Sequence, residues 1–121
     1  APLMRVQDLR AGKDIASHCE YDYIFSCTKF SFPPQRALWC DESKMRPVFP
    51  DLIDARSQDL KPRFFDAGQF YWGRSEAYLH SERMFAAHSI PIILPRHLVQ
   101  DIDTEEDWQR AELMYNAYVK E

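Results

Sequence analysis

The stretch that decides the fold is "SIPIILPRHLVQDIDTEEDWQRAELMY", residues 89–115. It opens with a run of apolar residues and prolines, which predicts a buried strand that ends at Pro95. Thr104 can cap a helix whose first turn holds three acids, where the helix dipole favours negative charge. The stretch therefore predicts a strand, an acidic turn and a helix, in that order.

Asp101 and Asp103 are not explained by the helix start. In extended backbone, residues two apart face the same way, so both carboxylates would project together while Ile102 packs on the other side. Such carboxylates repel, and the pKa of at least one rises unless a cation compensates. Mg²⁺ suits this role, because it takes oxygen ligands and often only one or two protein carboxylates. A bare DxD is more often a pair of solvated loop acids, so spacing alone leaves both interpretations open.

The other segments also alternate between helix and strand. Residues 5–18 ("RVQDLRAGKDIASH") predict an amphipathic helix, and residues 23–28 predict a buried strand. Residues 67–73 ("AGQFYWG") predict an aromatic strand, after which Ser75 is expected to cap a short helix. Between about residues 31 and 65 the chain has four prolines in "SFPPQRALWCDESKMRPVFPDL", which predicts short edge strands and turns. The alternation predicts an α/β domain with a mixed or parallel sheet.

The composition of the chain argues against some classes of function. The chain has 121 residues, 45% of them hydrophobic, which fits one domain or a piece of one. Its net charge is −4 with both signs interspersed, which argues against a nucleic-acid or anionic-membrane surface. No apolar run approaches the roughly 20 residues of a membrane helix. The first residues, "APLMR", do not resemble a secretory signal, and we expect the chain to be a segment of a longer protein.

The three cysteines, Cys19, Cys27 and Cys40, form no CxxC motif and cannot all pair. A reducing compartment is the simpler interpretation, so a cytoplasmic location is expected. We expect all three side chains to be ordinary buried residues.

Three blocks of sequence resemble one family. "RSQDL" (56–60), "DAGQFYWG" (66–73) and "IPIILPRHLVQDIDTEEDWQRAELMY" (90–115) are together similar to the C-terminal half of acylneuraminate cytidylyltransferases. The resemblance implies a nucleotide-diphospho-sugar-transferase-like (Rossmann-like) mixed sheet. It also implies that residues 1–121 are the C-terminal part of a single cytidylyltransferase domain, with a proline-rich dimerisation arm at about residues 31–65.

Enzymes of this family join a nine-carbon sugar acid to CMP, using CTP and Mg²⁺ and releasing pyrophosphate. The blocks are most similar to the pseudaminic acid branch, and Ala67, where relatives often have asparagine, fits that branch. This implies a CMP-sugar for surface glycan or flagellin glycosylation. N-acetylneuraminate is the alternative substrate, and a non-catalytic dimerisation or sugar-acid-binding module is the alternative of another class.

The resemblance implies that Asp101 and Asp103 are catalytic Mg²⁺ ligands. It also implies five substrate-binding residues, namely Arg36, Arg56, Gln58, Phe70 and Tyr71. Each has a plainer interpretation: Arg56 pairs with Asp59 or Asp54 on the surface, Arg36 only solubilises a turn, and half of the aromatics in the strand are core. Arg36 is expected to cross the interface of a homodimer into the partner's site.

The family's CTP site begins with a loop rich in glycine and basic residues, which holds phosphates through backbone N–H groups. This chain has three glycines, all dispersed, and no such loop. CTP and the sugar acid are therefore expected partners of the complete enzyme, and the 121-residue chain alone is expected to be inactive.

Overall fold

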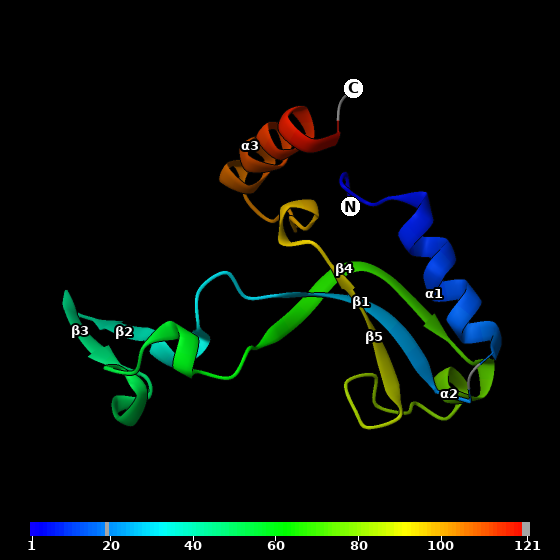
Figure 1. The fold of residues 1–121 in the computed structure, drawn as a ribbon, viewed down its shortest axis with the longest axis horizontal. Helices are drawn as coiled ribbons and strands as arrows, with labels where there is room; N and C mark the ends of the chain where they lie inside the picture. The colour runs from blue at the N-terminus through cyan, green and yellow to red at the C-terminus, as the bar shows by residue number, and fades with distance from the viewer. Residues whose placement is uncertain (19, 120–121) are drawn as a thin grey trace. The chain divides into compact units, whose positions relative to one another are not determined.

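The structure is a computed structural model that describes residues 1–18 and 20–119 (Figure 1). The chain folds as two compact units. The first, which we call the sheet unit, contains the described residues up to Thr28 and those from Asp66 onward. The second, which we call the hairpin unit, is Lys29–Phe65.

The sheet unit is built on three strands in the order β4-β1-β5. Their bounds are Tyr23–Lys29 for β1, Phe64–Gly73 for β4 and Ser89–Leu94 for β5. β1 and β5 are parallel, with Ile24 beside Ile90 and Thr28 beside Leu94. β4 runs opposite to β1, so the sheet is mixed (Figure 1). The three strands expected from the sequence are confirmed, and with them a mixed α/β fold.

Three helices accompany the strands: α1 (Val6–His18), α2 (Ser75–Leu79) and α3 (Glu105–Met114), the last continued by a π-helical turn, Tyr115–Val119. All three were expected, but the predicted cap of α2 is wrong. Arg74, not Ser75, holds the N-cap position, and no side chain caps this helix. The backbone N–H of Arg74 donates to the Asp22 carbonyl, and its guanidinium donates to the Asp22 carboxylate. These bonds hold Arg74 extended, so Ser75 is already the first helical residue.

α1 packs closely on β4 because Gly12 has no side chain. A Cβ at this buried glycine would lie 2.8 Å from Trp72 Cδ1 and 2.9 Å from Phe70 Cε2, which is closer than carbon atoms pack. The Trp72 indole N–H donates to the Leu9 carbonyl at 3.1 Å, so the ring is bonded to the same helix. The contact fixes α1 over the strand that leads into the candidate site.

The hairpin unit contains β2 (Leu38–Asp41) and β3 (Lys44–Pro47), an antiparallel pair. The turn between them has positive φ at Glu42 and Ser43, the conformation that matches the twist of a two-residue hairpin. Three 3₁₀ turns complete the unit: Pro34–Arg36, Pro50–Leu52 and Ser57–Asp59. The short strands and turns expected for the proline-rich segment are confirmed.

The cysteines divide between the two units. Cys27 is buried in β1, as expected, but Cys40 is exposed, so the expectation of burial is wrong there. Cys40 lies on β2, whose residues are all exposed within the hairpin unit. Cys19 lies outside the described residues. None of the described helices is long and apolar enough to cross a membrane.

Candidate functional site

The acidic turn connects β5 to α3. The chain leaves β5 at Leu94, makes a 3₁₀ turn at Arg96–Leu98 and then buries Val99. The Arg96 guanidinium donates to the Val99 carbonyl at 2.6 Å and closes this turn. The acidic turn therefore starts from a buried anchor on the carboxyl side of a parallel strand, where α/β proteins commonly bind ligands.

The backbone of the acidic turn is irregular. Residues 99–104 form neither helix nor strand, and the chain bends at Asp103. The regular extended geometry from which we expected Asp101 and Asp103 to share one side is therefore absent. The bend follows from the cap of α3, because the backbone N–H groups of Asp103 and Thr104 both donate to the Asp107 carboxylate. The projection of both aspartates to one side stays a prediction.

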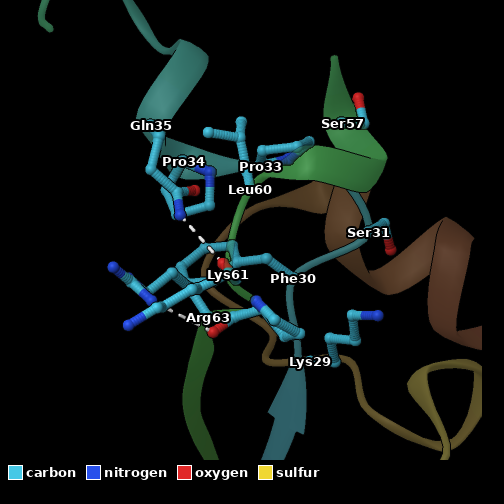
Figure 2. A pocket seen from close by; sticks show the side chains of 11 residues that line it. Lys29, Phe30, Ser31, Pro33, Pro34, Gln35, Ser57, Leu60, Lys61 and Arg63 are labelled. Atoms are coloured by element: carbon cyan, nitrogen blue, oxygen red, sulfur yellow. Dashed lines mark hydrogen bonds between the residues drawn. The ribbon is translucent and has the colours of Figure 1, made fainter. Parts of the chain in front are cut away.

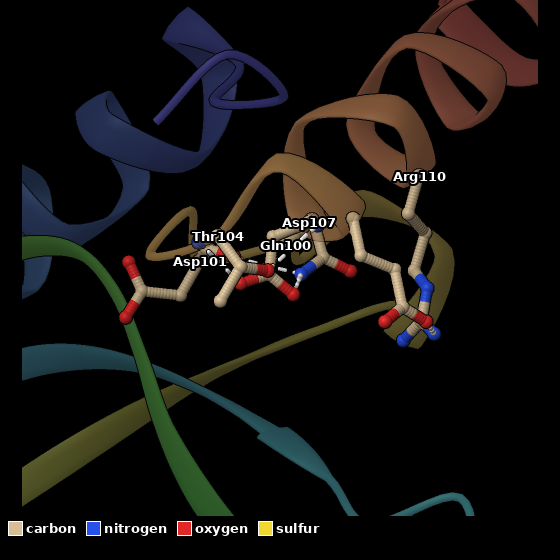
Figure 3. Close-up of polar contacts among 6 residues, drawn as sticks. Gln100, Asp101, Thr104, Asp107 and Arg110 are labelled. Carbon is tan, nitrogen blue, oxygen red and sulfur yellow. Dashed lines mark hydrogen bonds and ion pairs between the residues drawn. The ribbon is translucent and has the colours of Figure 1, made fainter.

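The start of α3 is a capping box. The Thr104 hydroxyl accepts from the Asp107 backbone N–H at 3.1 Å, and the Asp107 carboxylate accepts from the Thr104 N–H at 3.0 Å (Figure 3). The predicted N-cap is thus confirmed. The bond with Thr104 and the N–H of Asp103 hold the pKa of the Asp107 carboxyl below its usual value. Asp107 is committed to the helix and is not a candidate ligand.

Asp101 and Asp103 remain available. Both are exposed, and neither forms an ion pair with a lysine or arginine within residues 1–18 and 20–119. Arg110, in the second turn of α3, pairs with Glu106 at 3.6 Å instead. Figure 3 shows the Asp101 carboxylate pointing away from the cap. Its one hydrogen bond in the described structure is from the Ile102 backbone N–H, at 3.2 Å.

A cavity of about 150 Å³ lies beside the acidic turn. Gln100, Asp101 and Ile102 line it from the turn, and Ala67 and Gly68 line it from β4. The Gln100 side chain braces the turn by donating to the Asp101 carbonyl at 2.7 Å. Gly68 has a φ of 68°, and no atom would lie within 4 Å of a Cβ there. The backbone of β4 is therefore open to the cavity at this residue.

Tyr71 and Asp66 form a pair on β4 next to this cavity. The Tyr71 hydroxyl donates to the Asp66 carboxylate at 2.5 Å. Burial raises the pKa of Tyr71 to about 12, with further contributions from the bond to Asp66 and from the charges of Asp66 and Asp101. The structure thus brings Tyr71 and Asp101 into one electrostatic environment. Tyr71 stays protonated at neutral pH and acts as a hydrogen-bond donor.

Asp66 was missed by sequence reasoning. Residues five apart in a regular strand face opposite sides, so Asp66 and Tyr71 would not meet. Side chains along β4 do not simply alternate between the two faces, because Gly68 has a positive φ. An inserted residue has the same effect in a β-bulge. The Asp66 carboxylate also accepts from the Gly68 N–H at 2.9 Å and stabilises this conformation. A glycine inside a predicted strand was the available signal.

Phe70 and Gln69 hold β4 in place. Phe70 is only 7% exposed, and its ring borders Gly12 of α1, so it is part of the core. Tyr71 is 39% exposed, so of the two aromatics it is the one that reaches the surface. Gln69, which the sequence did not single out, donates its amide N–H to the Leu98 carbonyl at 2.7 Å and ties β4 to the turn after β5. The contact between Phe70 and the sugar stays a prediction. The burial of Phe70 in this unit does not favour it.

The other predicted substrate residues belong to the hairpin unit. Arg56 donates to both carboxylate oxygens of Asp59, at 2.8 and 3.4 Å, so the surface pairing considered from the sequence is present. Arg36 is exposed and donates to the Ile53 carbonyl at 3.2 Å. Gln58 is exposed on the 3₁₀ turn Ser57–Asp59. Their roles in substrate binding stay predictions.

The donors of the acidic turn fit a hard divalent cation. Asp101 and Asp103 offer free carboxylate oxygens, the ligands that Mg²⁺ prefers. No group of three or more His, Cys, Asp or Glu side chains that could hold a metal exists among the described residues. A cation here would complete its shell with water and with the oxygens of a bound phosphate, as Mg²⁺ commonly does.

A mixed α/β unit with unpaired carboxylates after a parallel strand is consistent with a metal-assisted nucleotidyltransferase. The chain is 36% identical over 118 residues, 97% of its length, to a protein named pseudaminic acid cytidylyltransferase from Campylobacter jejuni strain 81-176. The same values hold for the protein of that name from strain NCTC 11168. The chain spans about half of each, 51%. These relatives confirm the resemblance found in the sequence: over nearly its whole length the chain is a homologue of the cytidylyltransferases.

A third relative shares a shorter region. It is a Helicobacter pylori protein named pseudaminic acid cytidylyltransferase and UDP-2,4-diacetamido-2,4,6-trideoxy-beta-L-altropyranose hydrolase. The chain is 36% identical to it over 81 residues, which are 67% of the chain and 16% of that protein. No protein-family model matches the chain.

Proposed function

We propose that the chain is part of an enzyme that converts CTP and pseudaminic acid to CMP-pseudaminic acid and pyrophosphate. The observation that carries this proposal is the 36% identity along 97% of the chain to proteins named for that activity. Because the chain spans about half the length of these relatives, the activity is proposed for the complete protein. The Rossmann-like class is part of the same proposal, supported by the parallel pairing of β1 with β5.

In this proposal Asp101 and Asp103 hold Mg²⁺. The bound ion would neutralise negative charge that develops on the phosphate oxygens during nucleotidyl transfer. Asp101 and Asp103 are suited to hold it because their carboxylates are exposed and free of cationic partners in the described structure. The cap formed by Thr104 and Asp107 keeps Asp107 out of the metal site and fixes the bend at Asp103.

The sugar acid is proposed to bind on the Tyr71 side of the turn. The hydrogen bond to Asp66 orients the Tyr71 ring, whose exposed edge offers an apolar surface to a sugar. We propose that Arg56 binds the sugar carboxylate in the complete enzyme. Its bonds to Asp59 use two of the five N–H donors of a guanidinium, so three stay available. Gln58, on the same 3₁₀ turn, would add a neutral hydrogen bond.

We also propose that the hairpin unit is the dimerisation arm and that Arg36 reaches the partner's site. A two-stranded hairpin is at best marginally stable alone, so β2 and β3 need a covering surface. Large apolar side chains are exposed on this unit, namely Phe32, Leu38, Trp39, Met45 and Phe49. A second copy of the chain would cover them. The cytoplasmic location inferred from the cysteines stays a prediction.

Substrate preference tests the proposal. In the complete protein that contains this chain, pyrophosphate release is measured with CTP and Mg²⁺, and with either pseudaminic acid or N-acetylneuraminate. We expect release with pseudaminic acid and a kcat/KM at least tenfold lower with N-acetylneuraminate. Equal or inverted preference would assign the alternative substrate. No turnover of either acid, with sugar-acid binding retained, would support the non-catalytic module instead.

A further inference from the structure

The hairpin unit contains a pocket that none of the proposed catalytic or substrate residues lines. It lies between the segment that enters the unit, near Lys29 and Ser31, and the segment that leaves it, near Lys61 and Arg63 (Figure 2). Its volume is about 130 Å³. Neither Arg36 nor Arg56 lines this pocket, so any ligand it binds is separate from the proposed sugar site.

The pocket is strongly cationic. Lys29, Lys61 and Arg63 line it, and among the described residues no aspartate or glutamate does. None of the three cations lies within ion-pair distance of a carboxylate in the part of the chain that the structure describes. Ser31 and Ser57 also line the pocket. Three cations that have no carboxylate partner among the described residues form a surrounding that favours an anion.

A buried acceptor adds a second requirement. Gln35 is only 8% exposed, and its amide N–H donates to the Lys61 carbonyl at 2.9 Å (Figure 2). That bond fixes the amide orientation and leaves the Gln35 Oε1 atom buried, without a hydrogen-bond partner in the described residues. A buried acceptor of this kind needs a donor. An anion that also carries a hydroxyl would match both the charge of the pocket and this acceptor.

The pocket is small. A single tetrahedral oxyanion fits its volume of about 130 Å³. Phosphate at neutral pH meets every condition, because it is tetrahedral, negatively charged and keeps at least one P–OH group. Sulfate has the same shape and charge sign but no hydroxyl.

We propose that this pocket binds inorganic phosphate. The cations that line the pocket neutralise its charge, and its P–OH donates to Gln35 Oε1. The site belongs to the hairpin unit and shares no residue with the proposed metal and sugar residues. The inference thus goes beyond the proposed function, and neither depends on the other.

The test is a titration of the 121-residue chain with inorganic phosphate, sulfate and glycerol 3-phosphate at constant ionic strength. Backbone amide resonances are followed by two-dimensional NMR. We expect phosphate to shift the amides of residues 29–31 and 61–63 in a saturable manner, with sulfate binding at least tenfold more weakly. Glycerol 3-phosphate, which at neutral pH is mostly a dianion without a P–OH group, should bind at the same amides more weakly than inorganic phosphate, and equal affinity would contradict the role of the P–OH.

Variants separate the pocket from general surface charge. Lys61→Ala and Arg63→Ala should each weaken phosphate binding about fivefold, the effect of about 1 kcal/mol for an exposed charge pair. Lys44→Ala removes an exposed cation of the same unit outside the pocket and should leave the affinity unchanged. Gln35→Leu should abolish the preference for phosphate over sulfate. If that variant does not fold, the comparison of Lys61→Ala with Lys44→Ala still decides the charge requirement.

Three results would overturn the proposal. The first is the absence of saturable shifts at residues 29–31 and 61–63. The second is an equal loss of affinity in the Lys44→Ala and Lys61→Ala variants, because that indicates diffuse surface charge. The third is equal affinity of the unmodified chain for phosphate and sulfate, since Gln35 would then have no role.

Discussion

Gly12 is the residue at which a single methyl group tests the packing of the sheet unit. In a Gly12→Ala variant the new Cβ would lie 2.8 Å from Trp72 Cδ1 and 2.9 Å from Phe70 Cε2. Neither ring can move freely. Phe70 is buried, and Trp72 would have to weaken its bond to the Leu9 carbonyl.

The expected change in stability follows from three terms. Replacing a mid-helix glycine by alanine stabilises a helix by about 1 kcal/mol. Overpacking a tight contact costs about 1–3 kcal/mol, and a strained hydrogen bond adds up to about 1 kcal/mol. Together these terms give a loss of about 0–3 kcal/mol in the free energy of unfolding, whereas helix propensity alone would give a gain of about 1 kcal/mol.

Urea denaturation of the 121-residue chain, followed by far-ultraviolet circular dichroism, measures this change. Lys13→Ala is the matched control, because Lys13 is exposed on the same helix and its replacement should change stability by no more than about 0.5 kcal/mol. A Gly12→Ala variant that is about 1 kcal/mol more stable than the unmodified chain, the gain from helix propensity alone, would refute the close approach of α1 to β4.

Three further predictions concern single side chains. Thr104→Ala should lower the stability of α3 by about 1 kcal/mol, seen as faster amide hydrogen exchange, while Thr104→Ser, which keeps the capping oxygen, should not. Tyr71 should titrate near pH 12 by ultraviolet absorbance, and Asp66→Asn should lower that pKa. Because the folded pKa is raised, the stability contributed by Tyr71 should be complete below its unfolded pKa of about 10 and be lost as pH rises towards 12. Cys40 should be alkylated in the native protein, with peptides resolved by mass spectrometry, whereas Cys27 should react only on unfolding, because burial protects the thiol and raises its pKa.

Local chemistry was sufficient to predict the main elements. The apolar run at β5 and the Thr104 cap of α3 are formed by residues close in sequence, so their patterns identified them correctly. Ser75 was misassigned as a cap because the residue that fixes the start of α2 is Asp22, which is distant in sequence. Cys40 was expected to be buried because sequence does not report whether a strand has a covering layer.

The candidate site was predictable only in part. The paired aspartates stand out by charge and spacing, and within the described residues neither forms an ion pair, which agrees with a role as ligands. The Asp66–Tyr71 pair depends on the backbone break at Gly68, a change of register that alternation rules do not anticipate. The Gln35 Oε1 atom, which has no hydrogen-bond partner among the described residues, is likewise oriented by a contact with Lys61, which lies 26 residues away.

The most direct test of the account is the effect of Asp101→Asn and Asp103→Asn on the complete protein. Pyrophosphate release with CTP and pseudaminic acid is measured across a Mg²⁺ titration, with Glu105→Gln as the control acid in the adjoining helix turn. We expect each aspartate variant to lower kcat/KM by at least about 100-fold, as loss of charge stabilisation in the transition state does, while the control stays within about twofold. Unmodified rates and Mg²⁺ dependence in either aspartate variant would contradict the assignment of the acidic turn as the metal site.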